Sequence, residues 1–201
     1  MLIVRAETRK KYAAGDPRVQ PVALAVVHWT ASPPRHPGDA NEARLRAWLA
    51  DESRGSSTHF IVLRDGRVIQ AADLDERTWH AGGSTWIDPS GRAVKSVNER
   101  SIGIDMECVG YLRRSPAGAF ADGYGGAYHG AAPVVVNRQW LEPYTRQQSV
   151  AIVELARDLA RQLPVLRDRV RWVGHCDVKA GKPDPGPHFP WEAVCAAVAE
   201  V

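Results

Sequence analysis

The chain contains little cysteine: three residues in 201, at positions 108, 176 and 195. So few cysteines, odd in number, do not form the disulfide framework of a small secreted domain, so we expect reduced thiols. The chain also lacks an apolar run of roughly 18 to 20 residues, the length of a membrane span, and a basic segment followed by an apolar one at its start. We therefore expect no membrane partner and synthesis in the cytoplasm, from which the protein would leave only through lysis or a secretion system.

Charge of one sign is also scarce, because 26 Lys and Arg residues against 23 Asp and Glu residues leave a net charge of +3. This excess suits an anionic polymer but is too small for a nucleic-acid-binding surface, so we expect no nucleic-acid partner. Hydrophobic residues make up 44% of the chain and charged residues 24%, which is ordinary globular usage. The length suffices for one well-buried domain, and we expect a monomer.

Apolar patterns predict a three-layered α/β domain, in which a mixed central β-sheet is flanked by helices on both faces. Asp65-Gly66 lies between two apolar runs, which is typical of a hairpin. The expected strands are residues 22–27, 59–63, 68–71, 101–107 and 170–173. The expected helices begin at the cap Asp39, at a capping box of Thr145 with Gln148, and at Trp191.

The domain is expected to cover residues 21–201, after an irregular lead-in at residues 1–20. Residues 111–143 are rich in Gly, Ala and Tyr. We interpret them as a long insertion with little regular structure, and a loop of this length in a compact domain is commonly functional.

Residues 174–186 combine a histidine, two lysines and two carboxylates with Pro and Gly residues that restrict the backbone. Zinc binds imidazole nitrogen and carboxylate oxygen, and a catalytic site supplies about three protein ligands. His175 and Asp184 are two candidates, and His28, at the end of a buried apolar strand, is the best third. A lone histidine in the place of His28 is more often simply hydrogen-bonded, and Asp177 stays a minor alternative to Asp184.

Several motifs occur in an order that resembles one known family. They are Val27-His28-Trp29-Thr30-Ala31, Ser57-Thr58-His59-Phe60, Trp79-His80-Ala81-Gly82, Ser101-Ile102-Gly103-Ile104-Asp105, Gly174-His175-Cys176-Asp177 and Lys182-Pro183-Asp184-Pro185-Gly186. Together they resemble the zinc-dependent N-acetylmuramoyl-L-alanine amidases, whose fold is shared by phage lysozyme-type amidases and peptidoglycan recognition proteins. The resemblance implies Zn2+ at His28, His175 and Asp184.

The resemblance also implies the catalytic roles. Asp105 matches the family's general base or acid, which is usually Glu, and Glu107 on the same strand face could share that role. Lys182 matches the lysine that stabilises the oxyanion. Thr58 stands where related amidases often carry Tyr. The residues expected on the substrate side are Trp29, Thr58, His59, Trp79 and His80.

The function implied is hydrolysis of the amide between N-acetylmuramic acid and L-alanine in peptidoglycan or muropeptides. The alternative is a non-catalytic peptidoglycan-binding module of the same fold, which would lack a zinc ligand or an acidic or basic partner. A recycling enzyme, a phage endolysin and a delivered toxin all stay open. Cys176, next to a ligand, is interpreted as a small buried residue rather than a nucleophile.

Overall fold

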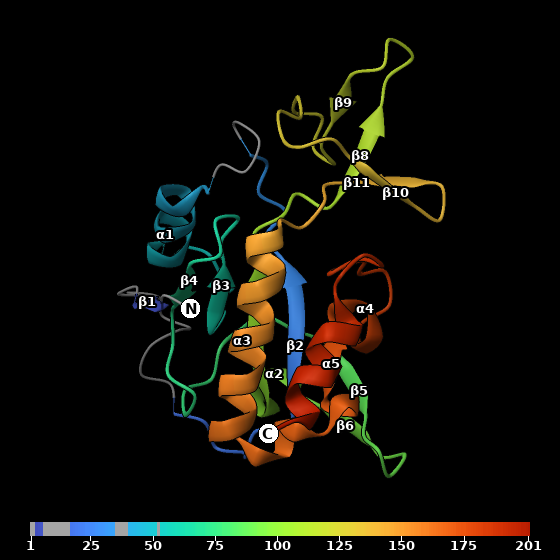
Figure 1. Cartoon of the computed structure of the whole chain (residues 1–201). Coiled ribbons are helices and arrows are strands. Elements are labelled where there is room, and N and C mark those ends of the chain that lie inside the picture. The colour runs from blue at the N-terminus through green and yellow to red at the C-terminus, as the bar shows by residue number, and fades with distance from the viewer. Residues whose placement is uncertain (1–2, 6–16, 35–39, 52) are drawn as a thin grey trace.

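A mixed six-stranded sheet forms the centre of the computed structural model, which describes residues 3–5, 17–34, 40–51 and 53–201 (Figure 1). The strand order is β1-β4-β3-β7-β2-β12. The strands are β1 (Ile3–Arg5), β2 (Leu24–Trp29), β3 (Phe60–Val62), β4 (Val68–Gln70), β7 (Ser101–Met106) and β12 (Trp172–Gly174). The expected α/β class is confirmed, and β3 and β4 form the antiparallel hairpin expected around Asp65-Gly66.

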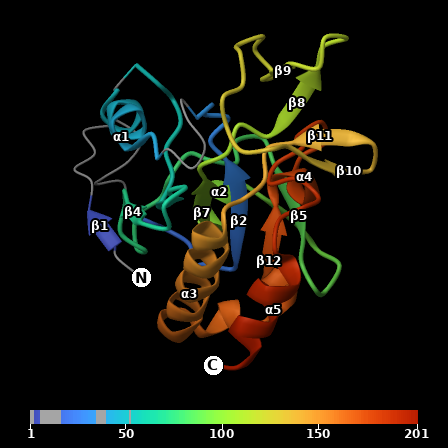
Figure 2. The same cartoon turned by 45° about the horizontal axis from the view of Figure 1, so that its top comes forward.

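Strand β2 is paired on both sides in parallel, with β7 and with β12. Residues 24–27 are fully buried, as expected for an apolar strand covered on both faces. The register sets His28 opposite Asp105 and Val27 opposite Gly174. Because parallel strands end at the same sheet edge, the residues that finish β2, β7 and β12 gather there (Figure 2).

Helices cover both faces of the sheet. Helices α3 (Arg146–Gln162) and α5 (Trp191–Ala199) pack on one face, and α1 (Glu42–Ala50) packs on the other with the hairpin of β5 (Thr85–Ile87) and β6 (Ala93–Lys95). Short helices α2 (Val97–Arg100) and α4 (His175–Val178) and 3-10 turns η1 (Pro164–Arg167) and η2 (Arg169–Arg171) complete the domain. No helix in the described part of the chain has the length and apolar character needed to cross a membrane.

The sequence signals for helix starts are confirmed where both residues of a capping box are present. Thr145 and Gln148 form the predicted capping box of α3. Helix α1 begins at Glu42 after Asn41, and the expected cap Asp39 lies outside the described residues. The irregular lead-in proposed for residues 1–20 is wrong at Ile3–Arg5, which add a parallel edge strand to β4.

The insertion is a second sheet, so the prediction of little regular structure there is wrong. Strands β8 (Tyr111–Arg114), β9 (Phe120–Ala121), β10 (Val134–Val136) and β11 (Gln139–Leu141) pair antiparallel in the order β10-β11-β8-β9. We call residues 111–141 the extension; it projects above the sheet edge where β2 ends (Figures 1 and 2).

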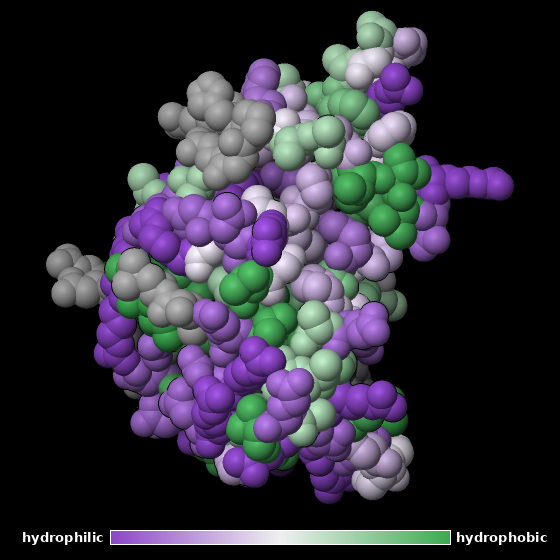
Figure 3. All heavy atoms as spheres, viewed as in Figure 1, coloured by the Kyte–Doolittle hydropathy of each residue, from purple (hydrophilic) through white to green (hydrophobic). Residues whose placement is uncertain are grey.

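Turn chemistry and ring packing explain why a glycine-rich segment folds in this way. Gly118 and Gly125 have positive φ in tight turns, and the Arg114 guanidinium lies over the rings of Phe120 and Trp140. Hydrophobic side chains gather over β10 and β11 in Figure 3, where Val135 is exposed.

Candidate metal centre

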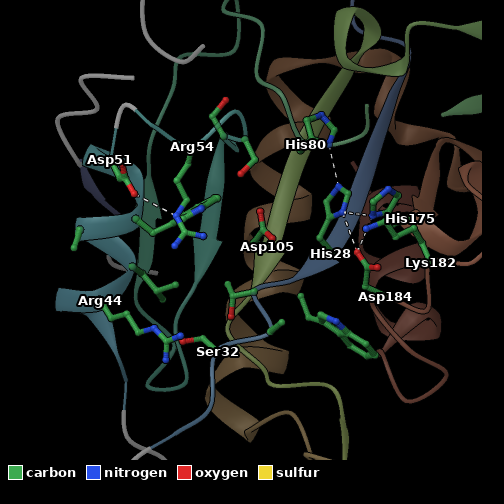
Figure 4. Close-up of a pocket in the computed structure, with 18 of the residues that line it drawn as sticks. His28, Ser32, Arg44, Asp51, Arg54, His80, Asp105, His175, Lys182 and Asp184 are labelled. Carbon is green, nitrogen blue, oxygen red and sulfur yellow. Dashed lines mark hydrogen bonds and ion pairs between the residues drawn. The ribbon is translucent and has the colours of Figure 1, made fainter. Parts of the chain in front are cut away.

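Three buried side chains converge at the sheet edge: His28 at the end of β2, His175 at the start of α4, and Asp184 in the loop that follows (Figure 4). The two Nδ1 atoms are 3.1 Å apart, and each lies 3.0 Å from Asp184 Oδ2. A tetrahedral shell with bonds of about 2.0–2.1 Å separates its donor atoms by about 3.3 Å. The three donors therefore already form one face of such a shell, as expected from the sequence.

The backbone brings these side chains together from distant segments. Because Gly174 pairs with Val27, His175 and His28 leave neighbouring strands at the same level. Asp177 Oδ2 accepts a 2.7 Å hydrogen bond from Gly174 N, so Asp177 caps α4 and does not join the three donors. The Cys176 amide donates to Asp184 O at 3.0 Å, which folds the loop back onto α4.

The donor set fits a divalent metal ion. Burial alone would raise the pKa of Asp184, but hydrogen bonds from His175 and His28 outweigh burial and hold this pKa below its ordinary value. Two imidazoles and one carboxylate leave a fourth position toward the cavity, as in catalytic zinc sites.

A cavity of about 900 Å³ opens in front of the triad. Lys182, Asp105, Trp29 and His80 line its metal end, and in Figure 4 Asp105 lies between the triad and the residues contributed by α1 and the segment after it. Burial raises the pKa of Asp105, although His28 and a hydrogen bond from Thr58 act in the opposite direction. A carboxyl with a raised pKa is a stronger base than an exposed aspartate.

Only part of the predicted substrate side reaches this cavity. Trp29 and His80 line it, whereas Thr58, His59 and Trp79 do not. His59 is fully buried, and Trp79 packs under the Arg77 guanidinium. His80 also contacts a candidate ligand directly, because its Nδ1 lies 2.9 Å from His28 Nε2. A role for His80 on the substrate side alone does not account for this contact.

Glu107 does not lie in the cavity, which corrects the interpretation that it could share the role of Asp105. It is fully buried, and its Oε1 pairs with Arg64 Nη1 at 2.7 Å while its Oε2 accepts the Arg64 amide at 3.0 Å. Arg64 also binds Glu142, at the base of the extension, at 2.8 and 2.9 Å. Glu107 therefore holds the sheet edge to the extension, and Asp105 alone of the two strand carboxylates faces the cavity.

The structure adds cavity residues that the sequence analysis did not single out. Arg44, Arg54 and Ser32 line the end away from the triad, and Tyr124 reaches the cavity from the extension. Helix periodicity in the sequence indicates only that Arg44 does not belong to the buried face of its helix; it does not indicate a cavity.

Cys176 is exposed rather than buried, which corrects the interpretation of this residue as a small buried one. Partial burial of the thiol sulfur, with the neighbouring Asp177, raises the pKa of Cys176 to about 11. A thiol with this pKa stays protonated at neutral pH, which argues against a nucleophilic role.

The chain is similar to known proteins in sequence and in fold. Residues 18–187 match the N-acetylmuramoyl-L-alanine amidase family. The 1,6-anhydro-N-acetylmuramyl-L-alanine amidase AmpD of Haemophilus influenzae is 27% identical over 194 residues, which cover 90% of this chain and 85% of that protein. AmpD of Escherichia coli is 31% identical over 163 residues, 81% of this chain and 64% of that protein.

Solved structures show the same fold. A crystal structure of AmpD superposes with a TM-score of 0.60 at 24% identity and covers 96% of this chain and 93% of its own. The Escherichia coli amidase AmiD, in complex with anhydro-N-acetylmuramic acid-L-Ala-D-γ-Glu-L-Lys, gives a TM-score of 0.60 at 27% identity, with 94% of this chain and 61% of AmiD covered.

Proposed function

This chain belongs to the N-acetylmuramoyl-L-alanine amidase family, and from that membership we propose a zinc-dependent enzyme that acts on soluble 1,6-anhydromuropeptides. The enzyme is an amidase that cuts the bond between N-acetylmuramic acid and L-alanine. The observation that carries the zinc proposal is the buried convergence of His28, His175 and Asp184. Two imidazoles and a carboxylate with an open fourth position are the ligand set of a catalytic zinc.

The anhydro form is proposed from the relatives. AmpD of Haemophilus influenzae and of Escherichia coli are both named as 1,6-anhydro-N-acetylmuramyl-L-alanine amidases, and AmiD was solved with an anhydromuropeptide. The cavity volume of about 900 Å³ suits a single fragment of this kind.

The catalytic roles follow from the residues at the metal end. A zinc ion at the triad would polarise the scissile carbonyl and lower the pKa of water. We assign Asp105 as the base that takes a proton from the attacking water and returns it to the departing amine of L-alanine. The Lys182 ammonium would stabilise the negative charge that develops on the carbonyl oxygen.

The opposite end of the cavity is suited to an acidic peptide stem. In a γ-linked D-Glu the α-carboxylate is free, and Arg44 and Arg54 supply cations to that end. Arg54 is paired with Asp51 at 3.2 Å. Arg44 extends toward Ser32 in Figure 4, and the buried Ser32 hydroxyl has no hydrogen-bond partner within the described ranges. We propose that the stem runs from the triad toward α1 and that Arg44 binds its free carboxylate.

The extension is proposed as one wall of the substrate site. Tyr124 lines the cavity and is 82% exposed, so its ring is open to stack on the face of a bound sugar or peptide. We also propose that the enzyme is a monomer. Because all three cysteines are free, we propose that it works in a reducing compartment.

Metal analysis combined with mass spectrometry of products tests the function. We expect about one zinc per chain, release of the peptide from an anhydromuropeptide, loss of activity on chelation and recovery with added zinc. His28→Ala and His175→Ala should each lose activity and zinc. Full activity in a thoroughly demetallated sample would refute zinc catalysis, and tight substrate binding without product would favour the non-catalytic module.

A further inference from the structure

A chain of hydrogen bonds leads away from the metal centre on the side opposite the proposed ion. His28 Nε2 lies 2.9 Å from His80 Nδ1, and His80 Nε2 lies 3.0 Å from Ser101 Oγ. Ser101 Oγ donates to the carbonyl oxygen of Val97 at 2.6 Å. This series of hydrogen bonds therefore runs from the candidate ligand His28, through two side chains, to a backbone acceptor in α2.

The last member sets the direction of every bond. A carbonyl oxygen only accepts, so the single Ser101 hydroxyl proton points at Val97 O, and Ser101 Oγ must accept from His80 Nε2–H. An imidazole with one ring proton, placed on Nε2, presents a lone pair on Nδ1. His80 Nδ1 therefore accepts from His28 Nε2–H, which leaves the lone pair of His28 on Nδ1, the atom that faces His175 and Asp184.

The strand below holds the His80 ring in this orientation. A Cβ atom at Gly103 would lie 2.6 Å from His80 Cγ, so only glycine at that position leaves room for the ring. The His28 and His80 rings meet edge to face, with an interplanar angle of 81°. The other histidine of the triad differs, because His175 Nε2 has no hydrogen-bond partner among the residues that the structure describes.

We propose that His80 and Ser101 are positioning residues of the metal centre, which hold His28 in the Nε2–H tautomer and so present its Nδ1 lone pair to the ion. The inference rests on the proposed metal site. It assigns a measurable effect on metal binding to Ser101, whose side chain is hydrogen-bonded to His80 and Val97 and not to any of the three candidate ligands. Loss of such outer partners typically weakens metal binding about 10- to 100-fold.

The test is zinc affinity, measured by competition with a chromophoric chelator. Ser101→Ala should bind zinc on the order of tenfold more weakly than the wild type. The matched control is Thr78→Val, which removes another fully buried hydroxyl, 2.9 Å from Nδ1 of His59, a histidine that is not a ligand. This control should bind zinc as the wild type does.

Two variants at His80 extend the test. His80→Leu removes the acceptor and should weaken binding more than Ser101→Ala does, whereas His80→Asn can present an amide oxygen near the position of Nδ1 and should recover part of the affinity. If His80→Leu fails to fold, Ser101→Ala still decides the question. Two-bond ¹H–¹⁵N NMR spectra of the zinc-loaded wild type should show His28 protonated on Nε2.

The outcomes separate this inference from the proposed function. Zinc binding by the wild type with unchanged affinity in Ser101→Ala and His80→Leu would overturn the positioning role and leave the metal site intact. An Nδ1–H tautomer of His28 in the zinc-loaded protein would also overturn it. A wild type that binds no zinc would refute the metal site itself, and the positioning role with it.

Discussion

His59 should make the enzyme lose stability as the pH falls below about 6.5. Its Nδ1 accepts a 2.9 Å hydrogen bond from the Gly103 amide, and its Nε2 lies 3.1 Å from Glu76 O. A second ring proton would have to sit on Nδ1, against the Gly103 N–H, with the Arg18 guanidinium 3.0 Å from Nε2. Burial, and then the charge of Arg18, lower the pKa of His59 to about 3.

The size of the effect follows from this pKa. Below pH 6.5 His59 binds a proton in the unfolded chain but not in the folded protein. The contribution of neutral His59 to the free energy of unfolding is therefore complete above pH 6.5 and is lost as the pH falls toward 3. Each pH unit in that window costs about 1.4 kcal/mol of unfolding free energy, or about 2 kcal/mol by pH 5. Over the whole window the loss from His59 is at most about 5 kcal/mol.

Urea unfolding at pH 8 and pH 5 measures this effect. His59→Gln lowers stability at both pH values, but the fall between them should be about 2 kcal/mol smaller than in the wild type. The control is His129→Gln, because His129 is exposed on the extension, and its fall should match the wild type. Equal falls in the wild type and His59→Gln would refute a buried neutral His59.

Three further predictions concern the site. Asp105→Asn should lower kcat by on the order of a hundredfold or more and keep the zinc. Glu107→Gln should instead lower the free energy of unfolding by about 3 to 5 kcal/mol, because it breaks the buried ion pair with Arg64. Loss of kcat in Glu107→Gln but not in Asp105→Asn would exchange the two roles. Arg44→Gln should raise KM on the order of tenfold for a stem with a free D-Glu α-carboxylate but not for the amidated stem, and an equal rise for both would contradict a carboxylate site. Replacing residues 115–133 with a short Gly-Ser linker should keep zinc and change the ratio of activities on anhydromuropeptide and on intact sacculi; equal changes would exclude the extension from substrate choice.

The sequence by itself determined the features that depend on short stretches of backbone. The capping box at Thr145 and the hairpin at Asp65-Gly66 follow from residues within a few positions of one another, and local hydrogen bonding decides both. The triad was also predictable. His28 and His175 each end an apolar strand, parallel strands deliver their ends to one sheet edge, and the family motifs add Asp184.

Tertiary structure alone decided which side chains pair across distant segments. Strand alternation places Asp105 and Glu107 on one face, yet Arg64, 43 residues before Glu107, removes Glu107 from the cavity. The sequence predicted a role for His80 on the substrate side. Its contact with His28 was not predictable, because the two residues are 52 positions apart and no sequence pattern relates them. Within the extension, the Arg114 side chain packs over the rings of Phe120 and Trp140, which come from two other strands. Such contacts depend on how whole helices and strands pack against one another, and periodicity along the sequence does not encode that packing. Once the side chains are buried, each polar group strongly favours the partner that the packing provides.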